Sequence, residues 1–314
     1  MDKPYTTYEE QVEILREKGL LISNDDEVIA LLKKCSYFGL VTGYKHPFKN
    51  KNGCYKFHTT INDIYAFYNY DMELRELFLK YILMIENHIK SLISYYFCQT
   101  YGDLETDYLN ANNYDYNEQK QDDINKLIGK LRYSMTNYDS HPYLQHHRDR
   151  YGNIPLWVLT RVLTLGIVSK MYSLLQPQTQ TLISKEFPYI SESELARMID
   201  LLSRFRNVCA HNERLYDYKY MNGEIRNTAI HKLLELRKQK GYYTQGKNDL
   251  FAVVIVFKYM LSEQEFSLFI KKFDEITTEL FQQTHILQES QVLKLMGFPL
   301  NWREIEKSPK EIII

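Results

Sequence analysis

The spacing of apolar positions has a helical period along most of the chain. From Met72 to about Gln99, apolar side chains recur every three or four residues, which places them on one face of a helix. Such a helix is roughly 40 Å long at 1.5 Å per residue, enough to form the spine of the fold. Asp71 directly precedes it and is expected to cap its first turn. The face comprises Leu74, Leu77, Phe78, Tyr81, Ile85, Ile89, Leu92 and Tyr96.

Capping signals predict further helices on both sides of this spine. The segments 7–10, 24–27 and 191–194 each begin with Thr, Asn or Ser and end with Glu, the pattern of a capping box, and each leads into an apolar-patterned run. Gly19 is placed to end the first of these helices in a left-handed conformation. Glycines and a proline between residues 36 and 57 predict a turn-rich connector with room for a short strand pair.

The central part of the chain predicts one long apolar helix that follows a loop. Pro155 opens a run that is apolar nearly all round and continues to about Leu175, which indicates a central helix. The residues before it, 140–155, are expected to form a loop, and residues 122–135 a short amphipathic helix. The most apolar run, residues 250–257, is only about half a membrane span, so it is expected to be a buried helix.

These patterns predict a mainly α protein in three parts. Residues 1–70 form an N-terminal helical extension with the turn-rich connector, residues 71–240 a helical bundle, and residues 241–314 C-terminal helices packed on the bundle. The chain has only 12 Gly and 8 Pro in 314 residues, which disfavours a turn-rich β architecture.

Charge and cysteine content narrow the range of functions. The formal net charge is -1, so any nucleic-acid binding has to use a local patch rather than the whole surface. The four cysteines lie far apart without a CxxC pair, which argues against a zinc site or a disulfide scaffold and favours a reducing cytoplasm. The N-terminus is polar, and no membrane association is expected.

The stretch RNVCAHN, residues 206–212, holds the strongest candidates for chemistry. Arg206 and His211 are about 140° apart on a helix, whereas Asn207 and His211 stack at i, i+4. Cleavage of RNA by its own 2′-hydroxyl needs a proton-transfer group near neutral pH, which histidine supplies, and a cation for charge on phosphorus, which arginine supplies. The structural alternative is that Arg206 pairs with an acid and His211 caps the helix end.

The same spacing occurs a second time, in Arg226 and His231. This pair follows the turn signal Asn222-Gly223, and its surroundings are less defined than the capped helix that carries Arg206. Spacing alone therefore does not identify a site, and the context favours the first pair.

Three other groups of residues are weaker candidates. A histidine and arginine cluster in the expected loop favours a solvated surface or a local phosphate-binding patch over a metal site, because neighbouring histidines point apart. Glu86 and Lys90, at i, i+4, most simply form a surface ion pair, although Glu86 can instead orient the 206–212 motif from across the bundle. Asn212 is a further supporting candidate beside His211. The cluster consists of His146, His147, Arg148 and Arg150.

The sequence resembles the Abi family of abortive-infection proteins, which belongs to the HEPN superfamily. The resemblance rests on five blocks in order: TTYEEQVEILREKGLLI with SYFGLVTGYKHPF, LRELFLKYILMIENHIKSLISYYF, LQHHRDRYGNIPLWVLTRVLTLGIVSKMYSLL, FRNVCAHNERLYD and MGFPLNW. HEPN ribonucleases carry an R-x4-6-H motif, and Arg206, Asn207 and His211 match it.

The resemblance implies a HEPN-like bundle that pairs as a homodimer and joins two motifs into one ribonuclease site. It implies no metal and no cofactor. The expected partner is RNA, as substrate or as a bound small regulatory RNA, and not DNA. The alternative is a non-catalytic RNA-binding or regulatory protein on the same fold.

Overall fold

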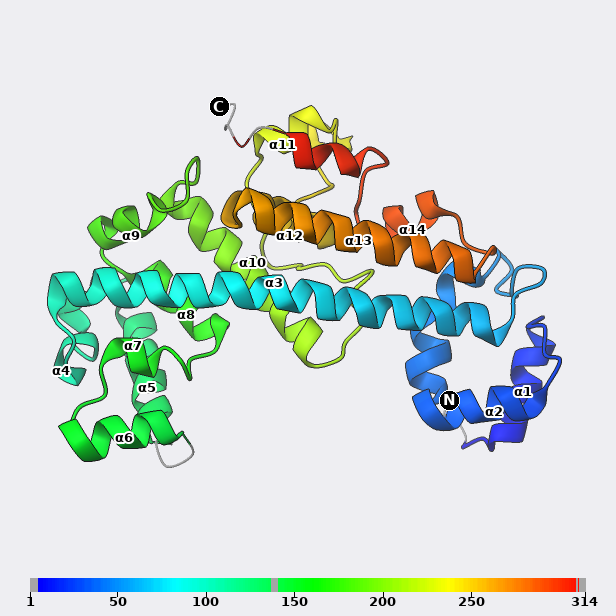
Figure 1. Cartoon of the computed structure of the whole chain (residues 1–314), viewed down its shortest axis with the longest axis horizontal. Helices are drawn as coiled ribbons and strands as arrows, with labels where there is room; N and C mark the ends of the chain where they lie inside the picture. Colours follow the sequence, from blue (N-terminus) through cyan, green and yellow to red (C-terminus); the bar gives the residue numbers. More distant parts are fainter. Residues whose placement is uncertain (1–4, 137–140, 309, 311–314) are drawn as a thin grey trace.

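The computed structural model describes residues 5–136, 141–308 and 310 and is built around one very long helix (Figure 1). Helix α3, Ile61–Tyr101, runs along the whole molecule, with the N-terminal helices at one end and α4–α9 at the other. Its 41 residues extend over about 60 Å at the usual helical rise. The mainly α fold class is therefore confirmed.

The spine begins at Ile61 and not after Asp71, so the expected cap was wrong. Thr60 is the N-cap and forms a capping box with Asp63, which occupies the position usually taken by Glu. Asp71 lies inside the helix, fully buried, and forms an ion pair with Arg75 one turn on. The predicted apolar face is otherwise confirmed: its members from Leu74 to Ile89 are buried, and Leu92 and Tyr96 are partly buried against the core.

The N-terminal part follows its capping signals closely. Helix α1 (Tyr8–Glu17) begins with the predicted box at Thr7, and Gly19 follows it with φ +84°. Asn24 caps α2 (Asp25–Cys35) through the N–H of Asp26, and the carboxylate of Glu27 accepts instead from Asn62 on α3. The connector forms the π-helix η1 (Tyr37–Thr42), the 3₁₀ turn η2 (His46–Phe48) and a single bridge between Lys49 and Tyr55.

Two expectations for the middle of the chain were wrong. The apolar run after Pro155 is not one helix, because it breaks into α7 (Leu156–Leu159) and α8 (Leu165–Leu174), where Thr164 caps α8 by accepting the Ile167 N–H. The expected loop at residues 140–155 contains α6 (Pro142–Tyr151), which has a proline at its start and Gly152 with φ +66° after its end. The remaining elements are α4 (Glu105–Tyr108), η3 (Ala111–Asn113), α5 (Gln121–Thr136) and α9 (Pro177–Ser184).

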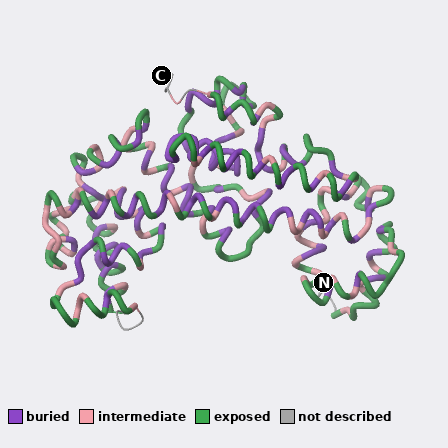
Figure 2. Tube along the Cα trace, in the orientation of Figure 1, coloured by how far each residue is buried: buried purple, intermediate pink, exposed green. Residues whose placement is uncertain are grey.

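The C-terminal helices complete the core against α3. Helix α12 (Leu250–Met260) is buried along its entire length, as expected, and α13 (Glu263–Gln283) packs along α3, so that buried positions converge there (Figure 2). Phe78 of α3 meets Phe269 of α13 edge to face, with ring centroids 5.2 Å apart. The other elements are α10 (Glu192–Ala210), α11 (Ala229–Leu233), β1 (Lys238–Gln239), β2 (Tyr242–Tyr243), α14 (Glu289–Leu295) and η5 (Trp302–Lys307).

One hydrophobic cluster extends from Val12 to Ile305, and the expected division at residues 70 and 71 falls inside the continuous helix α3. The three-part organisation stays a prediction. No helix in the described ranges is both long enough and apolar enough to cross a membrane.

Candidate active site at the end of helix α10

Helix α10 holds the 206–212 motif on a rigid, capped element. Ser191 and Glu194 form the predicted capping box, and the helix packs against α3 and α8. The apolar positions of the run after Ser191 form its buried face, which comprises Leu195, Met198, Ile199, Leu202, Phe205 and Cys209. Burial of that face leaves Asn207 and His211 exposed at the far end of the helix.

Arg206 contacts a buried carboxylate on the long helix. The side chain of Glu86 is only 6% exposed, and its Oε2 lies 3.7 Å from Nε of Arg206, while its Oε1 lies 2.6 Å from Nζ of Lys90. Glu86 and Lys90 form the expected ion pair, but its expected surface position was wrong, because both side chains are buried. One carboxylate lies between two cations, so the cluster carries a net positive charge.

The contact between Arg206 and Glu86 is an ion pair without a hydrogen bond. Nε of Arg206 and Oε2 of Glu86 are buried and have no hydrogen-bond partner in the described part of the chain. The side chain of Arg206 is 30% exposed, so its guanidinium lies at the boundary between the core and solvent. This placement anchors the side chain on one side and leaves it accessible to an anion on the other.

His211 and Asn212 close helix α10 with a backbone motif. His211 is the C-cap, and its N–H bonds to the carbonyl of Asn207 at 2.9 Å. Asn212 has φ +56°, and the N–H of Glu213 bonds to the carbonyl of Val208 at 3.1 Å, which together form a Schellman-type end. Asn212 thus has a structural reason to be present, since asparagine tolerates the left-handed conformation. Within the described residues, the His211 imidazole has no side-chain partner.

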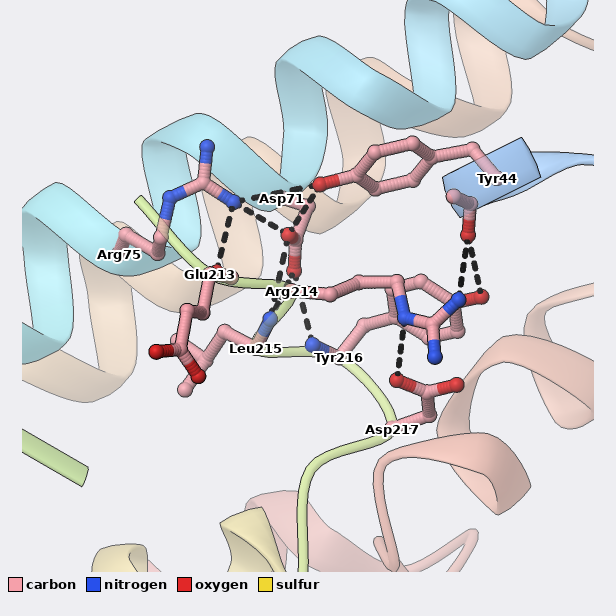
Figure 3. Close-up of polar contacts among 9 residues, drawn as sticks. Tyr44, Asp71, Arg75, Glu213, Arg214, Leu215, Tyr216 and Asp217 are labelled. Atoms are coloured by element: carbon pink, nitrogen blue, oxygen red, sulfur yellow. Dashed lines mark hydrogen bonds and ion pairs between the residues drawn. The ribbon is translucent and has the colours of Figure 1, made fainter. Parts of the chain in front are cut away.

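A buried polar network fixes the segment that follows the motif (Figure 3). The carboxylate of Asp71 accepts the backbone N–H groups of Leu215, at 3.2 Å, and Tyr216, at 2.8 Å. It also accepts the hydroxyl of Tyr44 at 2.7 Å and pairs with Arg75. Residues 215 and 216 are therefore held on α3, a few positions after His211.

Burial and the neighbouring donors shift the pKa of Asp71 in opposite directions. Burial raises the pKa of Asp71 above its ordinary value, and Arg75 opposes this effect most strongly. Arg75 also donates to the carbonyl of Glu213 at 3.4 Å, and Arg214 donates to the carbonyl of Gly43 at 2.9 Å. This network was not predicted from the sequence, although the pair Asp71-x-x-x-Arg75 in an otherwise apolar stripe is a signal that could have revealed it.

A known protein family matches the part of the chain that contains the 206–212 motif and the Asp71 network. The family model described as "Abi-like protein" matches residues 30–217, which is more than half of the chain. The chain belongs to the Abi-like family. The match includes the spine, the 206–212 motif and every partner of Asp71, but neither the first helix nor the closing MGFPLNW. Neither the curated proteins nor the solved structures compared with the chain contain a match. Membership suggests a role in abortive-infection defence against phage.

In this Abi-like protein the second Arg-x4-His pair has a structural explanation. His231 is fully buried, its Nδ1 accepts the N–H of Thr228 at 3.0 Å, and its Nε2 lies 2.9 Å from the carbonyl oxygen of Gly246. Burial lowers the pKa of His231 to about 4, so the ring is neutral at pH 7. The expectation of poorly defined surroundings was therefore wrong, because this histidine is a hydrogen-bonded part of the core.

The cluster at residues 146–150 lies on helix α6 and not in a loop. The rings of His146 and His147 are nearly perpendicular, at 88° with centroids 5.8 Å apart. Arg148 pairs with Glu105 at 2.9 Å, and Arg150 lies over the ring of Tyr151. Among the described residues no group of three or more His, Cys, Asp or Glu side chains is arranged to hold a metal ion. Whether this helix contacts RNA stays a prediction.

Proposed function

We propose that this Abi-like protein is a metal-independent endoribonuclease of the HEPN type that acts in abortive infection. The 2′-oxygen of RNA forms a bond to the adjacent phosphorus and loses its proton to a base. The bond from phosphorus to the 5′-oxygen breaks, and the leaving oxygen takes up a proton. The products are a 2′,3′-cyclic phosphate and a 5′-hydroxyl, so water and metal are not needed in this step.

The placement of Arg206 is the observation that carries this proposal. Its guanidinium is anchored by buried Glu86 and remains partly exposed beside the accessible residues Asn207 and His211. A permanently charged, planar group held in this way suits the charge that builds on the phosphorus oxygens. His211 would transfer the proton, and Asn207 would position the RNA by hydrogen bonding.

We further propose that two copies of the chain join their motifs. One chain supplies a single histidine in this context, whereas proton removal and proton donation are best served by two groups. A two-fold interface between the α10 ends would supply the second set without additional sequence. We expect light scattering to find a homodimer at micromolar concentration. A monomer with full cleavage activity would contradict this arrangement.

Replacing Arg206 provides the test of the proposed site. We expect the purified protein in excess EDTA to cut single-stranded RNA and leave 2′,3′-cyclic phosphate ends. Arg206→Ala should slow cleavage at least about tenfold, which is about 1.4 kcal/mol of transition-state stabilisation. Rates should be compared with RNA saturating for each variant, because an arginine near the site also contributes to affinity. RNA that is bound but never cut by the unaltered protein would support the non-catalytic alternative.

The second Arg-x4-His pair provides the matched controls for this measurement. Arg226 is exposed, so Arg226→Ala should keep most of the cleavage rate. His231→Ala should lower the free energy of unfolding by at least about 2 kcal/mol, because it removes a buried ring and its two hydrogen bonds. Its cleavage rate per folded molecule, with the folded fraction taken from urea denaturation, should remain near that of the unaltered protein. A folded but inactive His231→Ala together with an active Arg206→Ala would reverse the assignment.

A further inference from the structure

A cavity of about 530 Å³ lies directly beside the Arg206 cluster. One wall is helix α3 from Asn87 to Gln99, and the other is α7 with the turn that follows it. Lys90 lines the cavity and is the residue that shares Glu86 with Arg206. The cavity volume falls within the range of roughly 300–1,000 Å³ that is usual for sites of small ligands. A ligand in this cavity would therefore lie next to the proposed active site.

Two exposed aromatic side chains line this cavity. Trp157 is 48% exposed, whereas Trp302, the other tryptophan, is fully buried in the core. Tyr95, also in the lining, is 61% exposed. The indole of Trp157 makes no ring-stacking or cation–π contact within the described residues. Exposed aromatic faces of this kind are the surfaces on which proteins stack unpaired nucleobases.

The polar side chains of the cavity fit the remaining parts of a nucleotide. Within the described residues Arg161 has no carboxylate partner, and the lining of the cavity contains no Asp or Glu. The amides of Asn87 and Gln99 likewise have no hydrogen-bond partner in the described ranges. Burial raises the pKa of Cys98 to about 11, so its thiol is neutral at pH 7 and does not repel an anion. The cavity thus offers a cation for a phosphate and amides for the edge of a base.

We propose that this cavity binds one nucleotide, with its base stacked on Trp157 and its phosphate at Arg161. The nucleotide belongs either to a bound RNA strand or to a free nucleotide, and both present the same base and phosphate. In the first case the inference rests on the proposed ribonuclease function, because the cavity would hold a base of the substrate close to Arg206. Accessible aromatic faces beside an unpaired cation distinguish this cavity from an apolar groove, which would fit a hydrophobic peptide.

Binding to the His211→Ala protein tests the proposal, because this variant is expected not to cut the probe. The probes are adenosine 5′-monophosphate, followed by tryptophan fluorescence, and a labelled single-stranded hexa-adenylate RNA, followed by anisotropy. Buried Trp302 is shielded, so quenching by the nucleotide would report on Trp157. Adding Trp157→Ala or Arg161→Glu should weaken the affinity for the hexamer at least about fivefold. Trp157→Phe, which keeps an aromatic face, should remain within about twofold.

Two substitutions outside the cavity serve as matched controls. Tyr133 on α5 is 70% exposed, and Arg237 is an exposed arginine, so Tyr133→Ala and Arg237→Glu should leave both affinities unchanged. If adenosine 5′-monophosphate quenches the tryptophan fluorescence and Arg161→Glu abolishes this quenching, the cavity is a nucleotide site. This conclusion holds even if the unaltered protein never cuts RNA. Weakened hexamer binding without such quenching supports the RNA strand as the source. The proposal would be overturned if the cavity variants bound the hexamer as tightly as the controls and the mononucleotide caused no quenching. The proposed ribonuclease function would be unaffected by that result.

Discussion

Replacement of His211 by alanine is expected to abolish RNA cleavage while the protein remains folded. The imidazole is exposed at the end of α10 and has no side-chain partner in the described part of the chain. Loss of a general acid or base typically slows a reaction by about a hundredfold to ten-thousandfold. Loss of an exposed side chain changes the free energy of unfolding by about 0.5 kcal/mol or less, so the melting temperature should move by no more than about 2 °C. Cleavage assays and thermal melts on the same preparation measure both effects.

The exposed residue His285 provides the control for this substitution. It lies outside the residues matched by the family model, so we expect His285→Ala to cut RNA at the unaltered rate. An inactive His211→Ala protein with a greatly lowered melting temperature would instead support a purely structural role for His211 as the C-cap of α10. An active, stable variant would remove His211 from the proposed site altogether.

Local sequence signals predicted much of the frame that carries the site. The capping box at residues 191–194 and the apolar spacing of α10 were sufficient to place Asn207 and His211 on the exposed side of a helix whose other face is buried. Such signals work because capping and burial of one helical face depend on residues within a few positions of each other. The same local reasoning failed for the apolar run after Pro155, where the Thr164 cap interrupts the helix.

The polar contacts that organise the site were not predictable from spacing within one helix. Glu86 and Lys90 have the spacing of a surface pair, and only tertiary packing buries them and brings Arg206 of α10 to the same carboxylate. Asp71 has the side chain of a helix cap, and its buried position depends on a segment that lies 144 residues later in the sequence. Both errors concern carboxylates whose surroundings come from distant parts of the chain, which a helical periodicity does not contain.

Asp71→Ala is expected to cost the most stability of any single substitution considered for this protein. The change would leave the guanidinium of Arg75 buried without its partner, and removal of one member of a buried ion pair typically costs about 3–5 kcal/mol. It would also deprive the N–H groups of Leu215 and Tyr216 of their acceptor. Urea denaturation should show this loss as a fall in the midpoint with an unchanged slope.

An exposed aspartate in an ion pair provides the matched comparison for Asp71. Asp274 pairs with Arg303 at 2.6 Å, but its side chain is 43% exposed, so Asp274→Ala should cost less than about 1 kcal/mol. The double variant Asp71→Leu with Arg75→Leu should recover part of the lost stability, because it removes both buried charges together. If Asp71→Ala were no more destabilising than Asp274→Ala, the network in Figure 3 would not be what holds residues 213–217 against the spine. A large difference, with partial recovery in the double variant, would identify Asp71 as the group that fixes the chain immediately after the motif.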